Sequence, residues 1–151
     1  MERDMEKQRI LSELLADSHV LEMKRFIQHG KTSTFEHCVK VADISYKIDK
    51  RLSLKSDLKV LLTGALLHDF YLYDWHRYDN GTHRLHGFRH AKAASMNAEK
   101  IFHIDHRTSH VICSHMWPLN ITKIPRSKEA WIVCAADKFV SIRETRFRRR
   151  G

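Results

Sequence analysis

Two aspartates lie within segments of the chain that are otherwise apolar. Asp69 ends the segment LKVLLTGALLHD, which begins at residue 58, and Asp137 lies inside the apolar stretch 131–140. Burying an ionised carboxylate without a partner costs several kcal/mol. No lysine or arginine lies near the end of the first segment, and Lys138 points away from Asp137 if both lie on a helix. Each aspartate therefore needs another cation, and a bound metal ion would serve both.

Histidines are the natural partners of these aspartates, because neutral imidazole is the commonest metal ligand in proteins. His68 adjoins Asp69, His37 falls on the inward face of a predicted helix, and His115 follows an apolar stretch. A single inward histidine is more often a core residue bonded to a carbonyl. The metal hypothesis therefore depends on these histidines occurring together with the aspartates.

The segment 83–90 contributes a further histidine whose identity stays open. His86 and His90 lie one helical turn apart and could share a metal. Gly87 lies between them and costs a helix interior about 1 kcal/mol relative to alanine. We therefore expect a helix to start at or after residue 87, with His90 as the ligand and His86 at the mouth of the site. Most other histidines are expected at the surface, including His19, His29, His106 and His110.

Basic and aromatic side chains near these histidines are candidates for substrate contacts. Basic residues beside the third histidine could bind phosphate, and aromatic residues could stack on a base. The competing interpretations are ordinary surface charge for the former and core packing for the latter. The candidates are Arg84, His86, Arg89, Lys92, Trp117 and Lys138.

The elements that position these residues are predicted to be helices. Apolar residues recur at spacings of three and four, and strict alternation is absent. Six or seven helices are expected, at about 11–15, 20–27, 34–50, 58–69, 87–102, 106–115 and 128–144. Residues 70–86 break the pattern and are predicted to form a long loop, a feature that is usually functional in a compact domain.

Composition supports an all-α fold in one domain. The chain has 151 residues, of which 42% are hydrophobic, and holds only 5 glycines and 2 prolines. These numbers suffice for one core and are too low in turn residues for a sandwich or barrel. The charged start MERDMEKQRI is not typical of a signal peptide, and no apolar run predicts a membrane span. Three scattered cysteines fit a reducing cytoplasm, where we expect the protein.

The formal net charge of +9 raises the question of a nucleic-acid partner. The tail 143–151 contains five arginines and one glutamate, so it supplies +4 of this excess. We interpret it as a solvated, partly frayed tail. The remaining charge suits a protein that binds a small anionic substrate, and we expect neither a nucleic-acid partner nor a membrane.

The inward residues, taken in order, resemble the HD superfamily of metal-dependent phosphohydrolases. The order H…HD…H…H…D is similar to its two-metal branch, GALLHDF resembles the helix that ends in HD, and CAADKFVSI resembles the helix with the last aspartate. HAKAA at 90–94 resembles the segment that supplies an extra histidine. The chain looks most like small bacterial enzymes that hydrolyse diadenosine tetraphosphate. It lacks a GYP motif near His115, which argues against a cyclic-di-GMP phosphodiesterase.

This resemblance implies an HD-type helical bundle over residues 1–151, with a ligand-bearing core at 34–142. It implies two divalent transition-metal ions, of iron, manganese, nickel or zinc. One would be held by His37, His68, Asp69 and Asp137, and the other by Asp69, His90 and His115. Asp69 and His68 are the expected catalytic residues, and a metal-bridging hydroxide is the expected nucleophile. The substrate would be a phosphoester or phosphoanhydride, of a nucleotide in our interpretation.

Two alternatives remain at this point. The same ligands resemble those of the di-iron oxygenases of the superfamily, which consume oxygen. The other alternative is a helical module without catalytic activity that binds a nucleotide or nucleic acid, although the intact ligand set argues against it. The sequence makes no prediction of the oligomeric state.

Overall fold

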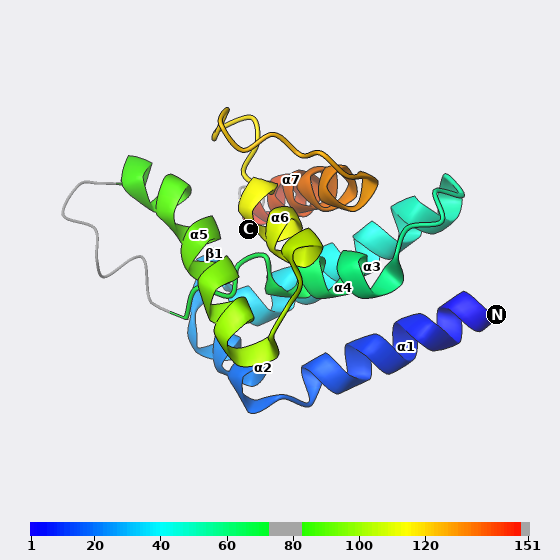
Figure 1. The fold of residues 1–151 in the computed structure, drawn as a ribbon. Coiled ribbons are helices and arrows are strands. Elements are labelled where there is room, and N and C mark those ends of the chain that lie inside the picture. The colour runs from blue at the N-terminus through cyan, green and yellow to red at the C-terminus, as the bar shows by residue number, and fades with distance from the viewer. Residues whose placement is uncertain (73–82, 149–151) are drawn as a thin grey trace.

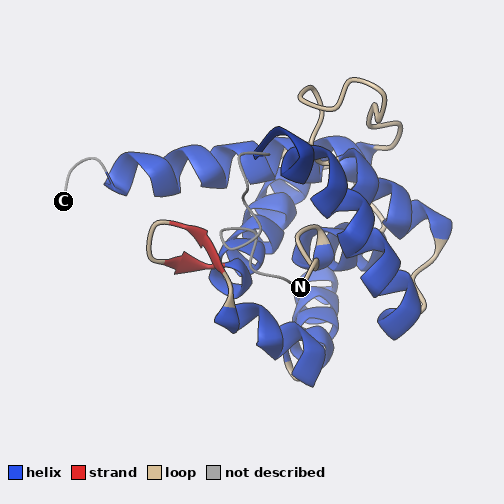
Figure 2. Cartoon of the chain, turned by 90° about the vertical axis from the view of Figure 1, so that its left-hand side faces the viewer, coloured by secondary structure: helices blue, strands red, loops and turns tan. Residues whose placement is uncertain are grey.

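The computed structural model describes residues 1–72 and 83–148, and of residues 83–88 and 148 only the backbone. Within these ranges the chain is mostly α-helical, as predicted (Figures 1 and 2). The helices are α1 (Glu2–Leu15), α2 (Ser18–Glu22), α3 (Thr34–Arg51), α4 (Leu58–Leu67), α5 (His83–Phe102), α6 (His106–Ser114) and α7 (Lys128–Arg148). None of the described helices is both long and apolar enough to span a bilayer.

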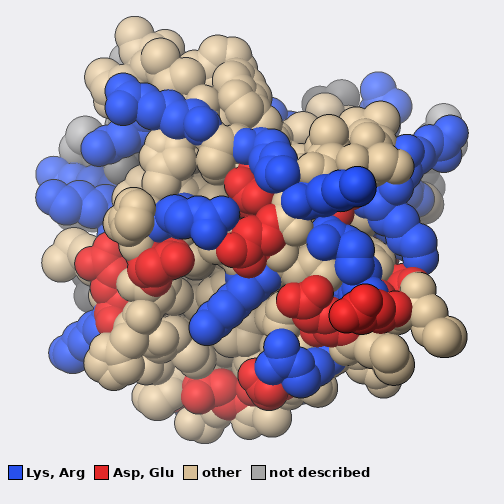
Figure 3. Space-filling model, turned by 45° about the vertical axis from the view of Figure 1, so that its right-hand side comes forward, with Lys and Arg blue, Asp and Glu red and all other residues tan. Residues whose placement is uncertain are grey.

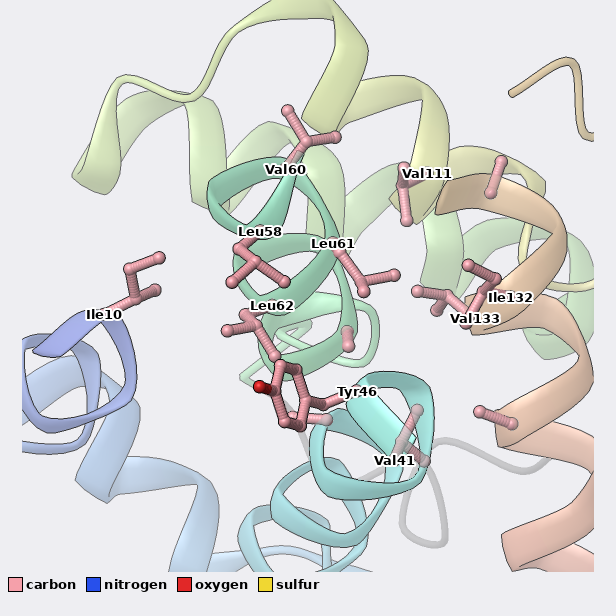
Figure 4. Packing of buried hydrophobic residues seen from close by; sticks show 14 of the residues in the cluster. Ile10, Val41, Tyr46, Leu58, Val60, Leu61, Leu62, Val111, Ile132 and Val133 are labelled. Carbon is pink, nitrogen blue, oxygen red and sulfur yellow. The ribbon is translucent and has the colours of Figure 1, made fainter. Parts of the chain in front are cut away.

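Helix α4 forms the centre of the fold because it is apolar on nearly every side. Every residue from Val60 to Leu67 is buried, and side chains from α1, α3, α6 and α7 pack around it (Figure 4). The Asp57 side chain caps its N-terminus by accepting hydrogen bonds from the amides of Lys59 and Val60. The chain therefore delivers His68, at the C-terminal end of α4, to the middle of the protein.

Helices α4 and α6 approach each other closely at Gly64. A β-carbon on Gly64 would lie 2.6 Å from Cγ1 of Val111, which is closer than such atoms can pack. The missing side chain therefore allows the two helices to meet. Both helices end in histidines of the predicted site, so this contact sets how far apart His68 and His115 lie.

Helix α3 begins with a capping box formed by Ser33 and Glu36. The Ser33 side chain accepts a hydrogen bond from the Glu36 amide, and the Glu36 carboxylate accepts one from the Ser33 amide. Helix α3 then packs against α4 and α7. This arrangement buries His37 completely.

The second helix ends earlier than the sequence predicts. Helix α2 ends at Glu22, a 3₁₀ turn follows at Met23–Arg25, and the chain then forms an antiparallel hairpin of β1 (Ile27–His29) and β2 (Thr32–Ser33). Gly30 adopts a φ of 60°, which reverses the chain at little steric cost. The hairpin lies beside α7 (Figure 2). Pairing of β1 with β2, together with a hydrogen bond from the Thr34 amide to the Phe26 carbonyl, takes the place of helical hydrogen bonds in this segment.

Two other helices extend further than predicted. Helix α5 starts at His83 and includes Gly87, because the cost of about 1 kcal/mol for one glycine is small beside the contacts of a long helix. Residues 83–86 of the predicted loop are thus helical, and residues 73–82 lie outside the described part. Helix α7 runs on to Arg148, so residues 143–148 form helix where a partly frayed tail was expected.

Charged side chains of both signs alternate on the face shown in Figure 3. Among the described residues, Arg3, Lys7 and Lys50 pair with acidic groups, with nitrogen–oxygen distances of 2.7–2.9 Å. On this face the basic excess is therefore divided by carboxylates and forms no uninterrupted basic patch.

Candidate metal centre

Six residues that are far apart in the sequence meet at one buried position. Helices α3, α5 and α7 carry His37, His90 and Asp137, and the C-terminal ends of α4 and α6 carry the others. None of the six residues is more than 9% exposed. They are His37, His68, Asp69, His90, His115 and Asp137. The structure therefore brings together every residue that the sequence nominated as a ligand.

The first ligand set consists of His37, His68, Asp69 and Asp137. Nε2 of His37 lies 3.0 Å from Oδ1 of Asp137 and 3.8 Å from Oδ2 of Asp69. Nε2 of His68 lies 3.5 Å and 3.3 Å from the same two oxygens. Each of the two imidazole nitrogens therefore lies within 3.8 Å of both carboxylate oxygens.

The second ligand set consists of Asp69, His90 and His115. The two Nε2 atoms lie 3.1 Å apart, and they are 3.2 Å (His90) and 3.5 Å (His115) from Oδ1 of Asp69. Asp69 therefore turns one carboxylate oxygen toward each set. A carboxylate in this position can bridge two ions.

The distances between ligand atoms suit metal ions. With bonds of about 2.1 Å and angles of 90–120°, two ligands of one ion lie about 3.0–3.6 Å apart. The observed separations, 3.0–3.8 Å in the first set and 3.1–3.5 Å in the second, cover this range. All the donors are imidazole nitrogens or carboxylate oxygens, which suit divalent transition metals.

The other ring nitrogens are held so that Nε2 faces the centre. Nδ1 of His68 and Nδ1 of His115 each lie 2.6 Å from a backbone carbonyl, of Ala65 and Ile112 respectively. A carbonyl can only accept, so each Nδ1 carries a proton, and Nε2 is the ring nitrogen that remains for an ion. This is the ring orientation that a metal ligand requires.

Two atoms at the centre are buried without a hydrogen-bond partner in the described part of the chain. They are Nε2 of His68 and Oδ1 of Asp69, one from each ligand set. An unsatisfied buried polar atom costs about 1–3 kcal/mol. A cation between the sets would satisfy both atoms, so the residues present fit a metal centre.

Comparison with known families decides the classification. Residues 34–141, which make up most of the chain, match the family model of the HD domain. The protein belongs to the HD domain family. Members of this family are generally metal-dependent hydrolases that bind divalent ions. Searches of curated proteins and of solved structures found no match.

The carboxylates of this HD domain are charged. Burial disfavours ionisation, but neighbouring histidines, chiefly His68 for Asp69 and His37 for Asp137, hold the pKa of each carboxyl well below its usual value. Burial likewise opposes the charge on His37, but hydrogen bonds to Asp137 and Glu144 raise its pKa to about 10. Nε2 of His37 cannot both donate to Asp137 and ligate an ion. Metal ions and protons therefore compete for this position.

Sequence reasoning missed several residues that contact the ligands. Gln28 donates a hydrogen bond to Asp69, and Glu144 accepts one at Nδ1 of His37. His29 is half-buried with its ring 5.6 Å from that of His37, although a surface position was expected. Cys38 lies 3.8 Å from Nδ1 of His68. Glu144 could have been found, because it follows Asp137 by two helical turns on the same face.

Only some of the residues predicted to contact substrate have side chains in the described part of the structure. Arg89 and Lys92 are exposed on α5, and the side chains of Arg84 and His86 lie outside the described part. Lys138 donates hydrogen bonds to the carbonyl of His115 at 2.9 Å and to Sγ of Cys134 at 3.3 Å. It therefore lies beside a ligand residue, with its amine engaged.

Two described aromatic side chains near the candidate ligands in the sequence, Trp117 and Phe70, pack against other aromatic rings. Trp117 is half-buried and packs edge-on against Trp131, with ring centres 5.0 Å apart. Phe70 is fully buried and packs against Phe102, so core packing accounts for it. The remaining aromatic residues of the segment 70–78, except Tyr71, lie outside the described residues.

Proposed function

We propose that this HD domain is a dinuclear metal-dependent phosphohydrolase that cleaves a phosphoester or phosphoanhydride of a nucleotide. The observation that carries the proposal is the position of Asp69. Its Oδ2 faces the first ligand set and its Oδ1 faces the second, at distances that suit ligands of two neighbouring ions. A single-metal site would not need a second cluster of buried histidines around the same carboxylate.

Each residue of the centre has a role in this proposal. The first set would hold one ion and the second set the other, with Asp69 shared between them. Divalent ions would supply Lewis acidity and would lower the pKa of a bound water to about 7. The protein itself fixes the imidazoles through their Nδ1 bonds, so the ligand geometry is in place before substrate arrives.

The charge balance of the centre favours an anionic substrate. Two divalent ions carry four positive charges, and the aspartates among their ligands, Asp69 and Asp137, carry two negative charges. With both ions bound, this excess would attract phosphate oxygens and stabilise the charge that develops on them in the transition state. Arg84, Arg89, Lys92 and Lys138 would add contacts to further phosphates.

The substrate class follows from chemistry and from resemblance. A nucleotide would place its phosphates at the ions and its base against an aromatic side chain such as Trp117, with His86 also in contact. The similarity to diadenosine tetraphosphate hydrolases makes dinucleoside polyphosphates the first compounds to test. The three free cysteines fit a reducing cytoplasm, where such nucleotides occur.

The proposal is tested by metal reconstitution followed by a substrate panel. Metal-free protein is reconstituted separately with iron, manganese, nickel and zinc, and bound metal is counted by elemental analysis. Each form is then assayed for release of phosphate or nucleotide from mono-, di- and polyphosphates. We expect up to two ions per chain and turnover of at least one substrate.

Two variants and two outcomes sharpen this test. Asp69→Ala should lose both ions and activity, whereas His106→Ala, which removes an exposed histidine, should change neither. Failure of every metal to bind would refute the proposal. Oxygen consumption by the iron form, with no hydrolysis of any substrate, would instead support the oxygenase alternative.

A further inference from the structure

Glu144 is an acid with a largely buried side chain in the most basic segment of the chain. Its side chain is only 5% exposed, while Arg143 and Arg146 on either side are exposed. It lies on α7 three residues beyond position 141, where the match to the HD domain family ends. The family motif therefore does not account for it.

Both oxygens of the Glu144 carboxylate are engaged by α3. Oε2 lies 2.9 Å from Nδ1 of His37, and Oε1 lies 3.3 Å from Nζ of Lys40. Nε2 of His37 faces the first ligand set on the other side of the ring. Lys40, Glu144 and His37 thus form a continuous line from the surface to the candidate metal centre.

His37 differs in this respect from two other histidines of the centre. His68 and His115 bond carbonyls of their own helices, three residues earlier, and so are held by local backbone. His37 is held by a charged side chain on a different helix. A carboxylate at Nδ1 fixes the tautomer. It also makes Nε2 a stronger electron-pair donor to a metal ion than a carbonyl at Nδ1 would.

We propose that Glu144 is a positioning residue for the first ligand set. It fixes the His37 ring with the proton on Nδ1 and strengthens the bond from Nε2 to an ion, and Lys40 holds the carboxylate in place. The inference rests on the proposed metal centre. The affinity of the first ligand set for an ion thus depends on a residue that is not itself a ligand.

The test measures the two binding events separately in the full-length protein. Metal-free protein is titrated with Zn²⁺ in competition with a chelator, by calorimetry. Asp137→Asn identifies the event that belongs to the first set, and His90→Ala identifies the other. Glu144→Ala should weaken the first-set event by about 10- to 100-fold, the usual effect of losing such a partner. Glu144→Gln, which keeps an acceptor but loses the charge, should cause a smaller loss.

Controls separate this role from a purely structural one. Arg146→Ala removes an exposed side chain from the same turn of α7 and should leave both events unchanged. Folding of each variant is checked by circular dichroism, and Glu144→Gln decides the question if Glu144→Ala does not fold. Unchanged first-set affinity in a folded variant, or equal weakening of both events, overturns the inference. If the unmodified protein binds no ion, the proposed function itself fails.

Discussion

The side-chain amide of Gln28 donates a 2.7 Å hydrogen bond to Oδ2 of Asp69, across 41 residues of sequence. The Oε1 atom of the same amide accepts a 2.7 Å hydrogen bond from the hydroxyl of Tyr71. Gln28 therefore presents its NH₂ group to the carboxylate. The small β-hairpin thus contributes directly to the candidate metal centre, by holding the aspartate that both ligand sets share.

We expect Gln28→Ala to destabilise the metal-free protein by about 1.5–3 kcal/mol, because the lost bond is made to a buried charge. In the metal-loaded protein the cost should be smaller, since ions then hold Asp69. Urea unfolding, with and without a chelator, measures both values. Gln8→Ala removes the exposed glutamine of α1 and serves as the control. An equal cost in both forms would show that Gln28 acts independently of the ions.

Helix α5 makes the choice between His86 and His90 testable. Both lie on α5, one turn apart, and His90 belongs to the second ligand set. We expect His90→Ala to reduce the bound metal from two ions to one. His86→Ala should keep both ions and raise the KM for substrate. Metal analysis and steady-state kinetics of the two variants check this, and the reverse result would move the ligand assignment by one helical turn.

The contact between Gly64 and Val111 predicts a specific pattern of stabilities. Gly64→Ala improves helix propensity by about 1 kcal/mol, but its β-carbon would overlap Val111, and such overpacking costs about 1–3 kcal/mol. We therefore expect no net gain in the free energy of unfolding, and a loss if the helices cannot separate. In a Val111→Ala background the same substitution should be neutral or stabilising. A double-mutant cycle from thermal or urea unfolding measures this coupling, and additive effects would contradict it.

Asp49 should make stability depend on pH. It is 1% exposed, and its carboxylate lies 2.7 Å from the Arg3 guanidinium and accepts a hydrogen bond from the Ser56 amide. Burial opposes ionisation, but the bonds to Ser56 and Arg3 outweigh it and hold the pKa of Asp49 below its usual value. A lowered pKa stabilises the fold above the unfolded value of about 3.9, and this contribution is lost as the pH falls through the folded pKa.

The matching experiment compares Asp49→Asn with the unmodified chain. At pH 7 we expect the free energy of unfolding of the variant to be about 1–3 kcal/mol lower than that of the unmodified chain, because the buried amide of Ser56 loses its charged acceptor. The difference should shrink as the pH drops below about 4. Glu13→Gln, at an exposed ion pair of α1, should show little difference at either pH. A constant difference across this range would mean that the charge of Asp49 is not what stabilises the fold.

Much of this protein could be predicted from its sequence. Helical spacing, caps such as Asp57 and Asp105, and the apolar segment that ends in His68-Asp69 are local features, and local features largely determine where helices form. The two aspartates could be named because a buried carboxylate in an apolar helix requires a cation wherever the helix packs, and the four histidines followed from their inward positions and from the resemblance to a known family. This argument needs burial but no coordinates.

Only the tertiary structure decided which atoms surround each candidate ion. The division of Asp69 between two histidine sets depends on how the ends of α4 and α6 meet α5 and α7, and Gly64 controls part of that approach. Gln28 and Glu144 reach the centre from a hairpin and from the last helix. Local spacing places Glu144 on the same face of α7 as Asp137, but it does not identify His37 as its partner, 107 positions away. It gives no sign of the contact between Gln28 and Asp69, which lie 41 positions apart. Hydrogen bonds between distant side chains exist only once packing has brought their helices and strands together.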